Sequence, residues 1–173
     1  MTTLLDEPRR LADFTGRVVR GRAAVLADLP SLVDVRVALL GDPVRVTRTV
    51  RPLSDVAAHL KVFQHEGVWV LPRLAALVPR SVGELAPVSL RGTVTERLAA
   101  TTRRREVPDG WTRRQLEPPA PPRRRTVVYS DGYYGALRRP DVELISWPVA
   151  GTVPAGLRTA DGVEHHVDVI VLV

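Results

Sequence analysis

The chain has 173 residues, of which 45% are hydrophobic, and its formal net charge is +6. That length suits one compact domain with its own apolar core. The lack of cysteine excludes disulfides and thiolate metal sites, and no apolar stretch approaches the roughly 20 residues that span a bilayer. The N-terminal segment has no apolar signal-peptide core, so we expect a soluble, cytoplasmic protein that does not enter membranes.

The positive charge comes almost wholly from arginine, because Lys61 is the only lysine. Together with abundant Ala, Val and Pro, this bias is typical of a GC-rich bacterial genome such as an actinobacterial one. Arginine clusters at 103–105 and 123–125 lie in or beside a proline-rich stretch without interleaved aromatic residues. A solvated or phosphate-facing loop explains them better than a nucleic-acid interface, so we expect no nucleic-acid partner.

Two parallel strands are predicted in the first third of the chain. The apolar run VRVALL at 35–40 ends at Gly41 and indicates a buried strand, and a second strand is predicted over 60–64. The segment between them begins with strand-like alternation, whereas the part after Pro52 has helical spacing with start signals at Ser54 and Asp55. Because a parallel pair needs a crossover of about a dozen residues, we expect a helix that begins late in this segment.

The middle of the chain predicts an excursion from the sheet. From 74 to about 105 the sequence is rich in Ala and Leu and indicates one or two helices. The run of prolines at 117–122 then predicts a stiff, extended linker. We expect a single domain over 1–173 with a helical and proline-rich excursion at about 74–122.

The last third returns to alternating elements. Asp131-Gly132 predicts a turn into a short helix, and the tail contains three short segments separated by Pro-Ala-Gly and Ala-Asp-Gly turns. In chain order the predicted elements are a strand at 126–129, the helix at 133–139, a strand at 142–145, a three-stranded antiparallel meander before 168, and an apolar strand at 168–173. The predicted fold class is α/β, a Rossmann-like parallel sheet with flanking helices plus a small three-stranded antiparallel meander.

Two segments resemble the nicotinamide-nucleotide domain of Baeyer-Villiger flavin monooxygenases. They are VFQHEGVWVLPR at 62–73 and the tail from SDGYYGALRRPDVELISW onward at 130–173, with a weaker match at 14–41. The resemblance implies a chain truncated to the NADPH-domain region, without the GxGxxG loop that holds FAD in such enzymes. The family fingerprint FxGxxxHxxxW is reduced to Phe14 and Gly16, with Arg20 and Ala24 in place of its histidine and tryptophan.

The cofactor motifs that the resemblance implies are degenerate. Where the family has a glycine loop for the pyrophosphate, this sequence has Gly41-Asp42-Pro43. A proline removes an amide donor there, and Asp42 adds negative charge beside the phosphate position. The family's Gln-Arg-Thr, which holds the 2'-phosphate, is replaced by Gln64-His65-Glu66. We therefore expect no flavin, no nicotinamide cofactor and no redox activity.

The family's catalytic arginine is less easily located. It precedes the tyrosine pair by seven residues, and an ungapped alignment places Thr126 there, with Arg125 at the neighbouring lysine position. A slip of one residue would return Arg125 to the catalytic position. Both assignments stay open at this point.

A vacated pocket is expected where Gly41, His65 and the Asp131–Tyr134 turn meet at the carboxyl ends of the parallel strands. The candidate catalytic residues are Glu66, His65, Asp131, Tyr133 and Arg125. Glu66 or Asp131 would act as the acid and His65 as its partner. Alternatively, the tyrosines are structural, Asp131 is a turn residue, and the His65–Glu66 pair is only solvated.

No metal site is expected, because the adjacent His165 and His166 of a predicted strand should point to opposite faces. One hypothesis is a cofactor-independent cyclase or isomerase of polyketide and antibiotic biosynthesis, for example one that forms spiroketals by acid catalysis on a small polyketide-like substrate. The other is a non-catalytic pseudoenzyme that binds a partner monooxygenase or a small ligand. A homodimer is a further alternative, in which an exposed apolar patch would be buried.

Overall fold

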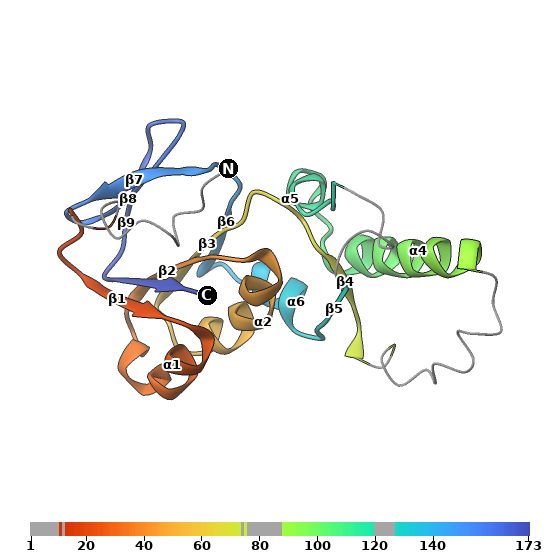
Figure 1. Cartoon of the computed structure of the whole chain (residues 1–173), viewed down its shortest axis with the longest axis horizontal. Helices are drawn as coiled ribbons and strands as arrows, with labels where there is room; N and C mark the ends of the chain where they lie inside the picture. Colours follow the sequence, from red (N-terminus) through yellow and green to blue (C-terminus); the bar gives the residue numbers. More distant parts are fainter. Residues whose placement is uncertain (1–10, 12, 74, 76–87, 120–126) are drawn as a thin grey trace.

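A computed structural model describes residues 11, 13–73, 75, 88–119 and 127–173. Its centre is a five-stranded sheet in which every neighbouring pair of strands is parallel (Figure 1). In spatial order the strands are β1 (Arg17–Arg20), β10 (Val169–Leu172), β2 (Arg36–Leu40), β3 (His59–Phe63) and β6 (Val142–Ile145). The predicted parallel sheet is confirmed, and β1, which the sequence did not suggest, forms one edge.

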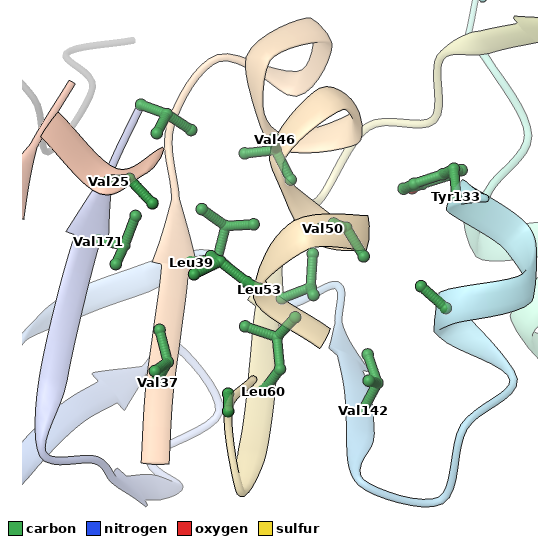
Figure 2. Packing of buried hydrophobic residues seen from close by; sticks show 14 of the residues in the cluster. Val25, Val37, Leu39, Val46, Val50, Leu53, Leu60, Tyr133, Val142 and Val171 are labelled. Atoms are coloured by element: carbon green, nitrogen blue, oxygen red, sulfur yellow. The ribbon is translucent and has the colours of Figure 1, made fainter. Parts of the chain in front are cut away.

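Helices cover one face of this sheet. They are α1 (Arg22–Ala27), the 3-10 helix η3 (Leu29–Leu32), α2 (Pro43–Ser54) and α6 (Tyr133–Leu137). Figure 2 shows α2 lying over the sheet, with Val46, Val50 and Leu53 directed toward Leu39 and Leu60 of the central strands. All five of these side chains are at most 1% exposed, and their burial is the main source of stability on this face.

The antiparallel meander covers the opposite face. It consists of β7 (Val149–Val153), β8 (Gly156–Thr159) and β9 (Glu164–His166), as the turn signals predicted. Leu157 is fully buried and belongs to one apolar cluster with Phe63, Ile145 and Ile170 of the parallel strands. Because the central strands β2 and β10 are buried on both faces, they read as nearly continuous apolar runs rather than as alternating ones.

The crossover helix differs from its predicted position. The sequence suggested a helix that begins after Pro52, whereas α2 begins at Pro43 and ends at Ser54. The reason is the N-cap: Asp42 accepts hydrogen bonds from the first turn, and Pro43 at the first helical position loses no needed donor. Pro52 lies within the last turn of this helix.

The excursion forms a separate lobe beside the sheet (Figure 1). Its short strands β4 (Trp69–Leu71) and β5 (Val127–Tyr129) pair in parallel, and α4 (Val88–Glu106) and α5 (Gly110–Gln115) lie between them in the chain. Helix α4 lies within the stretch that the sequence predicts to be helical, while 74, 76–87 and 120–126 lie outside the described residues. Among the described helices, none is long and apolar enough to cross a membrane.

The two tryptophans that flank the apolar strands differ in their surroundings. Trp69 is buried on β4, as expected for a core residue, whereas the side chain of Trp147 is 57% exposed. Trp147 follows the end of β6, in the segment that leads to β7, where the chain has left the buried sheet.

Candidate functional site

The turn between β2 and α2 is where a Rossmann-like fold binds the pyrophosphate of a dinucleotide. Gly41 has a φ of 142°, and a Cβ atom there would collide with the carbonyl oxygen of Val173. The amide of Asp42 donates to that same carbonyl, at 2.9 Å. The glycine therefore lets the turn approach the end of β10 closely.

The first amides of α2 are bonded to a carboxylate of the chain itself. Oδ1 of Asp42 accepts hydrogen bonds from the amides of Val44 and Arg45, each at 3.1 Å. Pro43 has no amide hydrogen to offer. The donors that a bound pyrophosphate would use at this helix end are thus already satisfied by a negative group, and the residues present do not fit a dinucleotide.

The end of β3 places Gln64, His65 and Glu66 in different surroundings. Gln64 is buried, and its Nε2 donates to the backbone carbonyl of Glu66 at 2.8 Å. His65 and Glu66 are partly exposed, and Nε2 of His65 lies 4.0 Å from Oε1 of Glu66. This pair is reachable from solvent and could exchange a proton with a ligand.

The tyrosine pair at the start of α6 is buried. The hydroxyl of Tyr133 donates to Oε1 of Gln64 at 2.8 Å, and burial raises the pKa of Tyr133 far above its usual value. Burial also raises the pKa of Tyr134, to about 12, and the two ring centroids lie 5.2 Å apart. These contacts fit the structural alternative for both residues, because neither side chain is open to a ligand.

Asp131 connects two segments of the backbone. Its Oδ1 accepts a hydrogen bond of 2.6 Å from the amide of Arg73, which follows β4. This hydrogen bond holds the turn after β5 against the end of β4, which is a structural role of the kind expected for a turn residue. Arg125, the remaining candidate, lies outside the described residues, as does Thr126, so the choice between them stays open.

The candidate residues are only partly brought together. Tyr133 bonds to Gln64 directly before the His65–Glu66 pair, whereas Asp131 faces Arg73. Asp131 lines a hollow of about 660 Å³ between α1, α2 and the turn after β5, and neither His65 nor Gly41 lines it. This hollow could not be predicted from the sequence, because the arginines that line it come from separate elements and form no motif.

A second hollow, of about 620 Å³, lies at the opposite edge of the sheet, where β2, β3 and β6 begin. It is lined by Lys61, whose Nζ lies 3.3 Å from Oε2 of Glu143, and by His59 and His166. His165 and His166 differ in burial as alternation along β9 predicts, since His165 is buried and His166 exposed. Within the described residues, no three His, Asp or Glu side chains are grouped so that they could hold a metal ion.

The sequence is similar to those of uncharacterized monooxygenases. No family model matches the chain. It is 32% identical over 201 residues to an uncharacterized monooxygenase of Mycobacterium tuberculosis and to its counterpart in Mycobacterium bovis. Each match includes 99% of this chain but 40% of the relative, so the chain spans about two fifths of the length of the curated relatives it matches.

Solved structures show the same fold. An open crystal structure of cyclohexanone monooxygenase matches 94% of this chain with a TM-score of 0.68 at 19% identity. A crystal structure of OTEMO with FAD bound matches 94% of the chain with a TM-score of 0.74 at 17% identity. The chain covers 43% of each of these structures. The predicted resemblance is thus confirmed at the level of sequence relatives and of fold.

Proposed function

We propose that this chain keeps the nucleotide-binding scaffold of the monooxygenases that it resembles without binding NADPH, and that it acts as a cofactor-independent cyclase or isomerase. The first half of this proposal depends on one observation, the carboxylate of Asp42 at the N-terminus of α2. The second half depends on the solvent-accessible His65–Glu66 pair at the end of β3.

The position of Asp42 opposes dinucleotide binding in two ways. A pyrophosphate would have to displace the carboxylate from the amides of Val44 and Arg45, which breaks the helix cap. If the carboxylate stayed, two negative groups about 4 Å apart would repel each other by about 1 kcal/mol in water and by more where water is excluded. The exchange of the family's arginine for His65 also removes a permanent cation from the 2'-phosphate position.

Titration with NADPH tests the first half directly. We expect no saturable change in NADPH fluorescence or in heat of mixing up to about 1 mM, since a Kd above that value corresponds to less than about 4 kcal/mol of binding free energy. The double variant Asp42→Ser with Pro43→Gly should bind NADPH more tightly than the unaltered chain. Micromolar binding by the unaltered chain would contradict the proposal.

The proposed chemistry is acid-catalysed loss of water from a hemiketal. The carboxylic acid form of Glu66 gives its proton to the hemiketal hydroxyl, water leaves, and an oxocarbenium ion forms. A second hydroxyl of the substrate attacks this ion, and its proton passes to His65 and returns to Glu66. The net reaction is loss of one water, and a polyketide-like ketone that contains two hydroxyl groups would be the substrate class. The substrate, including this class, is part of the proposal.

The second half is tested with a synthetic dihydroxyketone that cyclises slowly without catalyst. The unaltered chain should accelerate spiroketal formation and favour one diastereomer. Glu66→Gln should lower the rate by about 100-fold, the usual range for loss of a general acid. Asp131→Asn tests the other candidate acid, and Glu96→Gln on the exposed surface of α4 is the control. Unchanged rate and diastereomer ratio in both Glu66→Gln and Asp131→Asn would exclude these acids.

A second function, binding to a partner monooxygenase, is favoured by apolar side chains on the excursion. Val94 and Leu98 lie one turn apart on α4 and are 61% and 42% exposed, and Trp111 on α5 is 66% exposed. Large apolar residues that gather on a surface often mark a protein interface. Sedimentation of the chain with a flavin-loaded monooxygenase of its own genome should then show a complex that Trp111→Ser weakens. Sedimentation of the chain alone distinguishes this complex from a homodimer.

A further inference from the structure

The hollow beside α2 is unusually rich in arginine. Residues of α1, α2, the segment after β4 and the turn after β5 surround it, so four parts of the chain contribute. Its lining residues are Arg22, Leu26, Arg48, Arg51, Pro52, Arg73, Tyr129, Ser130, Asp131 and Gly132. The helices α1 and α2 are in contact, which places the arginine of α1 beside those of α2.

Within the part of the chain that the structure describes, carboxylates balance only a part of the positive charge of this hollow. Among the described residues, no carboxylate forms an ion pair with Arg22, Arg48 or Arg73. Of the four arginines, Arg51 alone has such a partner among the described residues, Asp55, with 3.1 Å between Nε and Oδ2. Asp131 is the single acidic residue of the lining, and it is bonded to a backbone amide. Like charges that gather in a concave surface repel each other unless an anion binds there.

The backbone beside the hollow leaves space for an arginine. A Cβ atom on Gly132 would lie 2.9 Å from both Cγ and Cδ of Arg51, so the side chain of Arg51 passes directly over this glycine. The hollow also has an apolar part, formed by Leu26, Pro52 and Tyr129, whose ring is 41% exposed. Cationic and apolar parts therefore adjoin in one cavity.

We propose that this hollow binds a small phosphate ester, with Arg22 and Arg48 at the phosphate and Tyr129 against the organic group. Guanidinium groups form paired hydrogen bonds with phosphate oxygens, and an exposed tyrosine ring offers a flat apolar surface. The site is distinct from the N-terminus of α2, because Arg48 lies six residues further along the helix, about 9 Å from Asp42. It does not depend on the proposed cyclase activity.

Calorimetric titration with phenyl phosphate at fixed ionic strength tests the proposal, because this probe joins a phosphate to an aromatic ring. The unaltered chain should bind it saturably, and the double variant Arg22→Gln with Arg48→Gln should raise the Kd at least about tenfold, as expected for loss of two charge-assisted contacts. The double variant Arg45→Gln with Arg97→Gln is the matched control, since it removes the same two charges from exposed positions of α2 and α4 outside the hollow. Its Kd should stay within about twofold.

A second variant tests the organic half of the ligand. Tyr129→Ala should weaken the binding of phenyl phosphate and leave that of inorganic phosphate unchanged. Equal loss of affinity in the Arg45→Gln/Arg97→Gln control and in the Arg22→Gln/Arg48→Gln variant would overturn the proposal, since the effect would then be one of net charge. No saturable binding of phenyl phosphate would also overturn it, provided that thermal unfolding shows the protein to be folded. Tighter, strongly salt-dependent binding of a single-stranded oligonucleotide than of phenyl phosphate would overturn it in favour of a nucleic-acid surface.

Discussion

At the scale of single residues, the hydrogen bond between Tyr133 and Gln64 connects α6 to the end of β3. Both side chains are buried, and the amide of Gln64 is bonded at both ends, since its Oε1 accepts from Tyr133 and its Nε2 donates to the backbone of Glu66. The tyrosine therefore fixes the segment that presents His65 and Glu66 to solvent. A structural tyrosine can in this way matter to a neighbouring site without touching a ligand.

Replacement of Tyr133 by phenylalanine should destabilise the protein by about 1–2 kcal/mol, because a buried amide oxygen loses its partner. Urea unfolding monitored by circular dichroism would measure the change. Tyr129→Phe is the control, since the ring of Tyr129 is 41% exposed. Equal unfolding midpoints for the two variants would show that the Tyr133 hydrogen bond contributes nothing to stability.

His165 lies in a chain of hydrogen bonds that determines its tautomer. The hydroxyl of Thr159 donates to Oδ1 of Asp161 at 2.6 Å, so it accepts from Nε2–H of His165, 3.1 Å away. Nδ1 is then left to accept from Nζ of Lys61, at 3.4 Å. Burial and the neighbouring lysine both lower the pKa of His165 below its usual value, so the neutral imidazole is favoured.

Stability should consequently depend on pH through this histidine. Because its folded pKa is lowered, its contribution is complete above the unfolded value of about 6.5 and is lost as the pH falls through the folded pKa. The urea concentration at the unfolding midpoint should therefore decrease when the pH is lowered from 7.5 to 5.0. The decrease should be smaller in His165→Gln. The exposed neighbour provides the control: His166→Gln should retain the full decrease. If both variants retained it, the pH dependence would come from another group.

At the scale of elements, the cap of α2 joins stability to cofactor exclusion. Removal of the carboxylate in Asp42→Ala should cost about 1 kcal/mol of unfolding free energy, since two first-turn amides lose their acceptor. Chemical denaturation would measure this loss, with the exposed Asp13→Ala as the control. A loss no larger than that of Asp13→Ala would mean that water replaces the cap without cost.

The same element shows how far the sequence could predict the fold. The strand at 35–40 was predictable because a nearly unbroken apolar run suits a strand buried on both faces, and the strand at 60–64 was predictable from its apolar Leu60, Val62 and Phe63. The start of α2 was missed, since the alternation of Val44 and Val46 was given more weight than the capping signal of Asp42 and Pro43. The three-residue strand β4 was missed for a different reason, because it pairs only with the distant β5.

The candidate site was less predictable than the fold. The burial of Tyr133 and Tyr134 could be anticipated from the resemblance, whereas the contact of Asp131 with the amide of Arg73 joins residues 58 positions apart. The arginine hollow depends on the contact between α1 and α2 and on the end of β4, which no local pattern encodes. The positive net charge could be calculated from the sequence, but the clustering of four arginines in one hollow could not be predicted from it.

At the scale of the whole molecule, three layers stack in the order helices, parallel sheet and meander. The side chain of Leu157 from β8 is fully buried among residues of the parallel strands, so the meander shares its core with the sheet. Leu157→Ala should cost about 2–5 kcal/mol. The exposed Val163→Ala, which lies in the turn before β9, should cost much less.

Hydrogen exchange would show whether the layers unfold together. In Leu157→Ala we expect the exchange rates of backbone amides in the meander and in the parallel sheet to increase by the same factor, because the two layers share one core and unfold as one cooperative unit. Faster exchange in the meander alone would show that it opens as a separate unit.

The position of β10 has a consequence for the order of folding during synthesis. This strand comprises residues 169–172, yet it lies between β1 and β2 and pairs with both. Until it leaves the ribosome, the edges of β1 and β2 that β10 will pair with cannot be satisfied by their native partner, and unpaired edges invite association with other chains. The sheet can therefore close only after β10, the latest of its five strands in chain order, has been made, and folding should depend on chaperones more than that of a sheet whose central strand is made first.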